Sequence, residues 1–160
     1  MRNTTLCYLE RDGSLLMLFR NKKAVDENHG KWIGVGGKFE EGETPEECAV
    51  REVYEETGLK VGSLKLRGII TFVMQPLTTE YMFLYTCDDF SGELSDPDGC
   101  PEGILRWMEK EKLDELPMWE GDRIFLRLLM EGHPFFSLKL CYDQNGSLSQ
   151  AVLDGTVLTV

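Results

Sequence analysis

Three glutamates, Glu52, Glu55 and Glu56, are the side chains in this 160-residue chain whose type and spacing best suit chemistry. At about 100° per residue in a helix, Glu55 lies about 60° to one side of Glu52 and Glu56 about 40° to the other. The three carboxylates therefore share one face, where like charges repel. A hard divalent cation such as Mg²⁺, which prefers oxygen ligands, would relieve that repulsion. The spacing thus indicates a metal site.

The segment around these residues supports this interpretation. Residues 37–59 contain eight glutamates, and Arg51 is their only basic companion besides Lys38. A solvated helix surface usually interleaves lysines with glutamates, so a plain surface role accounts poorly for this charge. The glycine-rich run 34–37 lets backbone approach closely, and the carbonyl of Gly36 is a further candidate ligand.

A helix must position these carboxylates, and its ends are marked in the sequence. Thr44 suits the N-cap, Pro45 the first helical position, and Glu47 completes a capping box. Gly58 suits a left-handed C-terminal stop. The sequence predicts a helix over residues 45–57.

The remaining elements predict an α/β sandwich in a single domain spanning residues 1–160. A hairpin is expected at 3–10 and 14–20, followed by a polar loop at 21–30. Further strands are expected at 31–37, 64–75, 80–87 and 104–108, with a turn at 76–79. Helices are expected at 111–116 and 120–132, and a closing hairpin at 134–143 and 148–154.

The glutamate-rich segment resembles the Nudix box, G-x5-E-x7-R-E-U-x-E-E-x-G-U, where U is an aliphatic residue. Every fixed position is filled at the right spacing, by Gly37, Glu43, Arg51, Glu52, Val53, Glu55, Glu56, Gly58 and Leu59. The resemblance implies hydrolysis of a nucleoside diphosphate linked to a further group, with Mg²⁺ or Mn²⁺ as cofactor. It also implies an α/β/α sandwich with a mixed β-sheet.

The resemblance also assigns roles within the box. The implied metal ligands are Glu52, Glu55 and Glu56, assisted by the carbonyl of Gly36. Glu43 and Arg51 are implied to form an ion pair that holds the loop against the helix. A plain helix-surface interpretation instead pairs Arg51 with a glutamate four residues away; both are compatible.

Outside the box, the runs "GKW" and "MWEGD" are similar to those of 8-oxo-dGTP diphosphatases of the MutT type. This similarity implies that Trp119 stacks on the purine and that Asp122 reads its edge. The alternative is a hydrophobic anchor at Trp119 and a first-turn helix charge at Asp122. The chain departs from the pattern at Ile33, where relatives carry asparagine, and at Gly121, where they carry another aspartate. These departures leave the base open.

Further site candidates rest on weaker signals. Glu102 matches an additional acidic metal ligand or base in the relatives, although its surroundings are acidic in any case. Candidates for lining the base pocket are Phe72, Met74 and Met82, which as strand residues also suit the core. Lys23 and Lys38 are candidate phosphate contacts, although isolated lysines are often only solvated.

These observations predict metal-dependent hydrolysis of an oxidised purine nucleoside triphosphate such as 8-oxo-dGTP, giving the monophosphate and pyrophosphate. An ADP-ribose or sugar-nucleotide pyrophosphatase is the alternative, because such enzymes often carry a proline near the position of Pro76. An alternative of another class is a Nudix module that senses a nucleotide without cleaving it. Such modules commonly lose glutamates of the box, whereas this chain keeps Glu52, Glu55 and Glu56.

Composition limits the partners. The net charge of −11 argues against binding a nucleic acid polymer. Neither a membrane span nor a signal-peptide core is evident in the sequence. The five cysteines lack metal-ligand spacing and predict free thiols in a reducing cytoplasm. The oligomeric state stays open, a monomer included.

Overall fold

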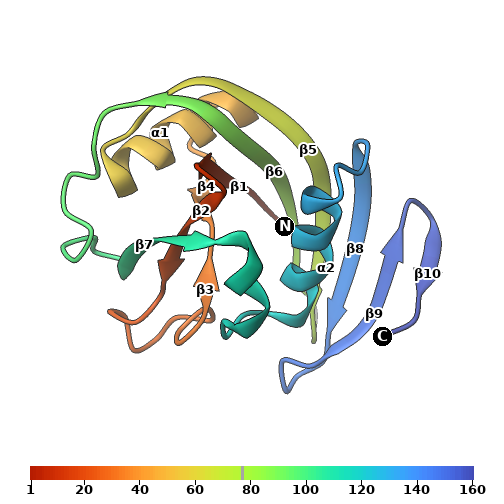
Figure 1. Cartoon of the computed structure of the whole chain (residues 1–160). Helices are drawn as coiled ribbons and strands as arrows, with labels where there is room; N and C mark the ends of the chain where they lie inside the picture. Colours follow the sequence, from red (N-terminus) through yellow and green to blue (C-terminus); the bar gives the residue numbers. More distant parts are fainter. Residues whose placement is uncertain (77) are drawn as a thin grey trace.

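The computed structural model describes residues 1–76 and 78–160, in which a curved mixed sheet carries a helix on each face (Figure 1). The strands are β1 Arg2–Arg11, β2 Ser14–Phe19, β3 Trp32–Ile33, β4 Val35–Lys38, β5 Lys60–Met74, β6 Thr78–Ser91, β7 Ile104–Glu109, β8 Phe136–Tyr142, β9 Leu148–Leu153 and β10 Thr156–Leu158. The helices are α1 Pro45–Thr57, the 3₁₀ helix η1 Lys110–Glu115 and α2 Glu120–Met130. None of these helices is long and apolar enough to cross a bilayer.

The sheet is mixed because two of its pairings are parallel. Its order is β10-β9-β8-β5-β6-β1-β2-β3, with β4 paired to β1 and β7 paired to β2. β1 runs parallel to β6, and β5 runs parallel to β8, whereas the neighbouring pairs are antiparallel. The long strands β5 and β6 arch from the α1 side of the molecule to the α2 side (Figure 1). The predicted α/β fold with a mixed sheet is confirmed.

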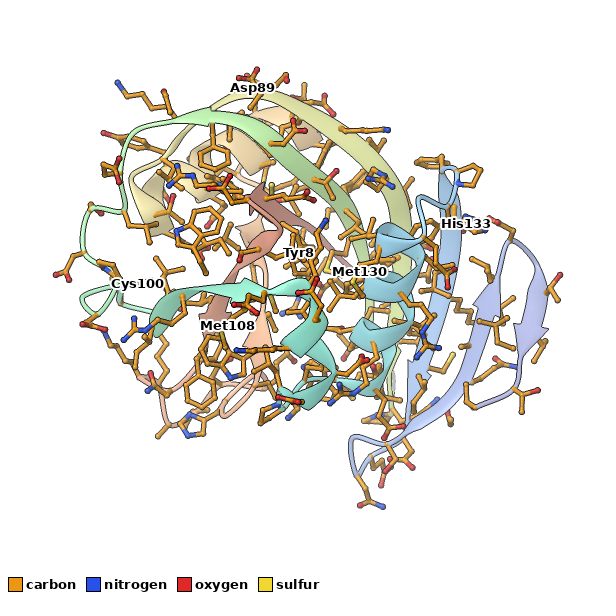
Figure 2. The ribbon with its side chains drawn as sticks, viewed as in Figure 1. Tyr8, Asp89, Cys100, Met108, Met130 and His133 are labelled. Carbon is orange, nitrogen blue, oxygen red and sulfur yellow. The ribbon has the colours of Figure 1, made fainter. Side chains whose placement is uncertain are left out.

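Two hydrophobic clusters pack on opposite faces of the sheet, because successive strand side chains point to opposite faces. On β1, Tyr8 joins the cluster that contains Phe125 of α2, whereas its neighbour Cys7 joins the cluster that contains Val53 of α1. Tyr8 lies in the interior of the molecule (Figure 2). The predicted layering of helix, sheet and helix follows from this alternation.

The ends of α1 agree with the prediction of a helix at 45–57. The Thr44 side chain accepts a hydrogen bond from the Glu47 amide, and the Glu47 side chain accepts one from the Thr44 amide. Gly58 ends the helix in the left-handed region at φ 80°. Local capping thus determines where the acidic helix starts and stops.

Several predicted boundaries were wrong by a few residues. The strand expected at 31–37 is divided at Gly34, where an added Cβ would lie 2.9 Å from the Cys7 carbonyl oxygen. β5 and β6 extend beyond 64–75 and 80–87, because they pair with each other well past those limits. The predicted helix 111–116 is the 3₁₀ helix η1, one residue earlier, the predicted helix 120–132 is the shorter α2, and strand β10 was missed. The predicted turn at 76–79 includes residue 77, which lies outside the described residues.

The five cysteines are free thiols, as predicted. Four of them, Cys7, Cys48, Cys87 and Cys100, are buried. Burial raises the pKa of Cys7 and of Cys48 above the usual thiol range. Cys7, Cys87 and Cys100 therefore behave as small apolar residues of the cluster that contains Val53.

Candidate active site

A cleft of about 690 Å³ joins the glutamates of α1 to the start of α2. One end is formed by Glu52 and Glu56 with the glycine turn, and the other by Trp119 and Asp122. Its floor comes from β1, β5 and β6, and the loop 20–31 contributes a wall. The cleft thus brings the acidic box and the late aromatic segment, far apart in sequence, into one site.

Arg51 of α1 connects the helix to the loop that precedes it. Its Nε lies 2.6 Å from Glu43 Oε2, and its Nη2 lies 2.9 Å from Glu43 Oε1. Nη2 also donates to the Lys38 carbonyl at 3.0 Å. Nη1 donates to Glu52 at 2.8 Å and to Glu55 at 3.2 Å. One guanidinium therefore orients both the loop and two of the three box carboxylates.

The predicted ion pair between Glu43 and Arg51 is present and bidentate. Its hydrogen bonds are the main reason that the pKa of Glu43 falls to about 2. Arg51 also contacts Glu55, one helical turn away, so the plain helix-surface interpretation holds as well. Glu47 is instead engaged in the capping box.

Glu52 and Glu56 meet the glycine turn at the inner end of the cleft. An added Cβ on Gly37 would lie 2.6 Å from the Glu52 carboxyl carbon, so only glycine leaves room for that carboxylate. Glu56 Oε1 accepts a hydrogen bond from the Gly36 amide at 3.3 Å. Glu56 Oε2 is buried and has no hydrogen-bond partner among the described residues.

The environment of Glu56 suits a bound cation. Burial is the main cause that raises its pKa well above the usual carboxyl range, and the negative charge of Glu52 raises it further. A buried carboxylate oxygen without a partner, next to a second carboxylate, is stabilised by a positive charge. The donor set of Glu52 and Glu56 therefore fits a divalent metal ion.

The structure places Glu55 away from this pair. Its side chain is 57% exposed, bonds to Arg51 and does not line the cleft. Across residues 1–76 and 78–160, no three acidic, histidine or cysteine side chains converge closely enough to hold a metal ion in the present arrangement. Arg51 is the physical reason, because it draws Glu55 towards the loop. The metal-ligand role of Glu55 stays a prediction.

Glu102 lines the cleft and is held by two cations. Arg20 Nη2 lies 3.3 Å from its carboxylate, and Lys23 Nζ lies 3.1 Å from it. Arg20 lines the cleft, whereas Lys23 is half-exposed and lies outside the lining. Sequence reasoning chose Lys23 and missed Arg20, although an arginine at the end of a predicted strand is a comparable signal. Lys38 is exposed and lines the cleft, as expected of a phosphate contact.

Phe72, Met82 and Ile33 line the cleft, and the role of Phe72 and Met82 in a base pocket stays a prediction. Phe72, Met74 and Met82 all pack against the core cluster that contains Tyr8, but Met74 is absent from the described lining. Met74 is the last residue of β5 and lies opposite Tyr142, which is also absent from that lining.

Trp119 is both an anchor and a wall of the cleft. Its side chain is largely buried, and its Nε1 donates to Asn28 Oδ1 at 2.8 Å. Its ring meets Tyr142 edge-on at 5.0 Å, and Lys31 Nζ lies 4.3 Å from the ring centre. Both interpretations of Trp119 are thus compatible with the structure. Asn28, which fixes the indole and lines the cleft, was not singled out from the sequence.

Asp122 is not a plain first-turn charge, because it is buried on the cleft wall with 5% exposure. Burial raises its pKa to about 8, against the opposing charges of Arg123 and Lys31. Burial also raises the pKa of Tyr8, and the negative charge of Asp122 raises it further. At neutral pH the Asp122 carboxyl is mostly protonated and offers both a donor and an acceptor.

Comparison with known proteins agrees with this site. The family model described as the NUDIX domain matches residues 1–129, which include the whole box and α2 almost to its end. The chain belongs to the Nudix family. It is therefore a hydrolase of nucleotide substrates, in a family whose members generally use divalent metal ions.

The relatives place this Nudix hydrolase near the MutT proteins. The uncharacterized Nudix hydrolase YvcI of Bacillus subtilis is 31% identical over 159 residues, covering 96% of this chain and 95% of the relative. An oxidized purine nucleoside triphosphate hydrolase of Danio rerio is 35% identical over 108 residues, covering 66% and 67%. The crystal structure of a MutT protein from Bacillus halodurans has a TM-score of 0.86 at 27% identity, covering 96% and 98%.

Replacing Arg51 tests its role as the link between loop and helix. We expect Arg51→Ala to lower kcat/KM by about ten- to hundredfold, because small misplacements around a reacting centre are costly. Amide hydrogen exchange over residues 38–44 should become faster in the variant. The control is Arg106→Ala, which removes the exposed ion pair with Asp98 outside the cleft. Unchanged exchange in the Arg51 variant would contradict this role.

The buried Asp122 carboxyl predicts a pH-dependent stability. The pKa of Asp122 is about 8 in the folded protein and about 4 in the unfolded chain. Between pH 4 and pH 8 the carboxyl group is therefore protonated in the folded state and ionised in the unfolded state. This stabilising contribution is present below pH 4 and is lost as the pH rises to 8. We expect Asp122→Asn to gain stability relative to the wild type across this window, by up to about 1.4 kcal/mol per pH unit. Urea unfolding at several pH values measures the difference, and a flat difference would refute the assignment.

Proposed function

We propose that this Nudix hydrolase cleaves an oxidised purine nucleoside triphosphate, such as 8-oxo-dGTP, to the monophosphate and pyrophosphate. The observation that carries the proposal is the single cleft with carboxylates at one end and an aromatic wall with a buried carboxyl at the other. The Danio rerio relative and a mouse relative, 31% identical over 125 residues, are both named oxidized purine nucleoside triphosphate hydrolases, which supports the same substrate class.

The box end of the cleft is suited to hold the phosphates and the metal. We propose Mg²⁺, with Mn²⁺ as the alternative, bound by Glu52 and Glu56, with Glu55, Glu102 and the Gly36 carbonyl as further candidates. When bound, the cation supplies a Lewis acid for the phosphate and lowers the pKa of an attacking water. Glu43 and Arg51 keep the glycine turn against α1. Lys38 and Arg20, which line the cleft, and Lys23, which pairs with Glu102, are the candidate contacts for phosphate oxygens.

The other end is suited to the base. A purine that stacks on Trp119 would gain roughly 1–3 kcal/mol from that contact. The Phe72 ring lies at 84° to the indole and would therefore meet the edge of that purine. Asp122, neutral at pH 7, can both donate to and accept from one edge of that base. Ile33 carries no hydrogen-bonding side chain, so this edge is read chiefly by Asp122 and by backbone groups. A pocket that hydrogen-bonds its substrate rejects analogues that leave its polar groups unpaired.

A hydrolysis screen tests this function. Its substrates are canonical and oxidised purine triphosphates, pyrimidine triphosphates, ADP-ribose and a nucleotide sugar, each with Mg²⁺. We expect pyrophosphate and an oxidised purine monophosphate as products. AMP and a sugar phosphate, without cleavage of any purine triphosphate, would overturn the proposal in favour of the sugar-nucleotide pyrophosphatase.

Replacing Glu56 tests the metal site. We expect Glu56→Gln to lower kcat by about a hundredfold or more at limiting Mg²⁺, because a charged ligand is lost. In a chelating buffer the variant should melt at the same or a higher temperature, because it no longer buries a carboxyl group beside Glu52. Glu41→Gln is the matched control, since Glu41 is an exposed glutamate of the same segment outside the cleft lining. Near wild-type turnover in Glu56→Gln would sink the assignment.

A further inference from the structure

Two oppositely charged side chains, Arg2 and Glu80, lie beside the apolar residues that line the cleft floor. In the sheet register, Arg2 of β1 lies opposite Glu80 of β6, and Glu80 lies opposite Phe72 of β5. Residues directly opposite in a sheet project from the same face. Arg2, Glu80 and Phe72 therefore form one row across three strands, and all three line the cleft. Sequence reasoning missed Arg2 and Glu80, which only the pairing of β1 with β6 brings together.

Glu80 is fixed by donors on both of its oxygens. Arg2 Nε donates to Glu80 Oε1 at 2.8 Å, and Arg2 Nη2 contacts the same oxygen. The Thr4 hydroxyl donates to Glu80 Oε2 at 2.7 Å. The Glu80 side chain is 14% exposed. The carboxylate is thus a rigid, nearly buried support for the guanidinium.

Arg2 keeps donors that the protein does not use. A guanidinium has five N–H donors, and Nη1 of Arg2 makes no hydrogen bond to any described residue. Nη2 also reaches Glu27 of the loop at 2.9 Å, but the Glu27 side chain is 53% exposed. Exposed ion pairs are weak, so a ligand can take the place of Glu27. The guanidinium can then present two N–H groups to a ligand in the cleft.

Stability alone gives a weak reason for this arrangement. A largely buried ion pair is often no more stabilising than apolar side chains of similar size. Apart from Thr4, which supports Glu80, the neighbouring residues on this sheet face that also line the cleft are apolar, namely Phe72, Met82 and Leu6. An oriented arginine at the end of such a surface is suited to read the polar edge of a flat ligand.

We propose that Arg2 is a further substrate-contact residue, which donates hydrogen bonds to the carbonyl-bearing edge of the base, and that Glu80 is its positioning residue. This inference rests on the proposed function and specifies its substrate class. A guanidinium offers donors only, so it favours the 6-oxo group of guanine-type bases and disfavours the 6-amino group of adenine-type bases. Arg2 thereby selects 6-oxopurines in the same cleft that Asp122 lines.

The test compares 8-oxo-dGTP with 8-oxo-dATP in the wild type, Arg2→Met and Arg2→Lys. We expect Arg2→Met to lower kcat/KM for 8-oxo-dGTP by about ten- to hundredfold, as for a lost hydrogen bond to a charged donor, with little change for 8-oxo-dATP. Arg2→Lys should restore part of the preference, because it keeps the charge but loses the planar fork. Glu80→Gln should reduce the same preference less, through KM rather than kcat.

Binding of the products gives a second readout that does not depend on the metal. Titration calorimetry of 8-oxo-dGMP and 8-oxo-dAMP in a chelating buffer should show the same loss of preference in Arg2→Met. Lys110→Met is the matched control, because Lys110 is 30% exposed against 33% for Arg2 and pairs with Glu10 at 2.8 Å outside the cleft. This control should keep the wild-type preference.

The outcomes separate this inference from the proposed function. A wild-type enzyme that cleaves neither triphosphate overturns the proposed function and this inference with it. A wild-type enzyme that cleaves them, with a preference that Arg2→Met leaves unchanged, overturns this inference alone. An equal loss for both bases also overturns it, because Arg2 would then act only through the fold. If Arg2→Met fails to fold, the ratio of kcat/KM for 8-oxo-dGTP to that for 8-oxo-dATP is measured in Arg2→Lys instead. A ratio equal to that of the wild type overturns the inference.

Discussion

The contacts of Arg51 are the constraint on which the site depends. A single guanidinium bonds Glu43, Glu52, Glu55 and the Lys38 carbonyl, so the loop, the glycine turn and α1 are held in one arrangement. Eight glutamates in 23 residues would otherwise repel one another. Arg51 neutralises part of this charge next to the loop that contains Glu43. Glu56, on the cleft, keeps a buried oxygen without a partner among the described residues, and a cation could bind there.

The sheet carries this local arrangement to the rest of the cleft. β4 pairs with β1, which sets Gly36 opposite Leu6, and β1 pairs in parallel with β6. β6 in turn pairs with β5, which carries Phe72. The glycine turn and the aromatic wall are thus linked through four adjacent strands. Such backbone pairing is rigid enough to keep a metal site and a base site at a constant separation.

The same cleft shows why charged side chains must be judged by their surroundings. Glu43, beside Arg51, has its pKa lowered to about 2, whereas Asp122, buried at the cleft wall, has its pKa raised to about 8. Glu43 lies in the loop that precedes α1, outside the cleft lining, whereas Asp122 is part of that lining. Hydrogen bonds to a cation favour the ionised form of Glu43, and desolvation favours the neutral form of Asp122. The first suits a structural anchor, and the second suits a group that exchanges hydrogen bonds with a base.

The sequence alone determined the acidic helix, its caps and the family, because these depend on neighbours within a few residues. Thr44, Glu47 and Gly58 act locally, and the spacing of the box is a property of one segment. Only the tertiary structure decided which charged groups reach the cleft. Glu55 bonds to Arg51, Arg20 lines the cleft whereas Lys23 only pairs with Glu102, and Met74 is not part of the described lining. Arg2 and Glu80 are 78 positions apart, and parallel strand pairing alone makes them neighbours. Sequence patterns record local periodicity, whereas such contacts depend on the register between distant strands.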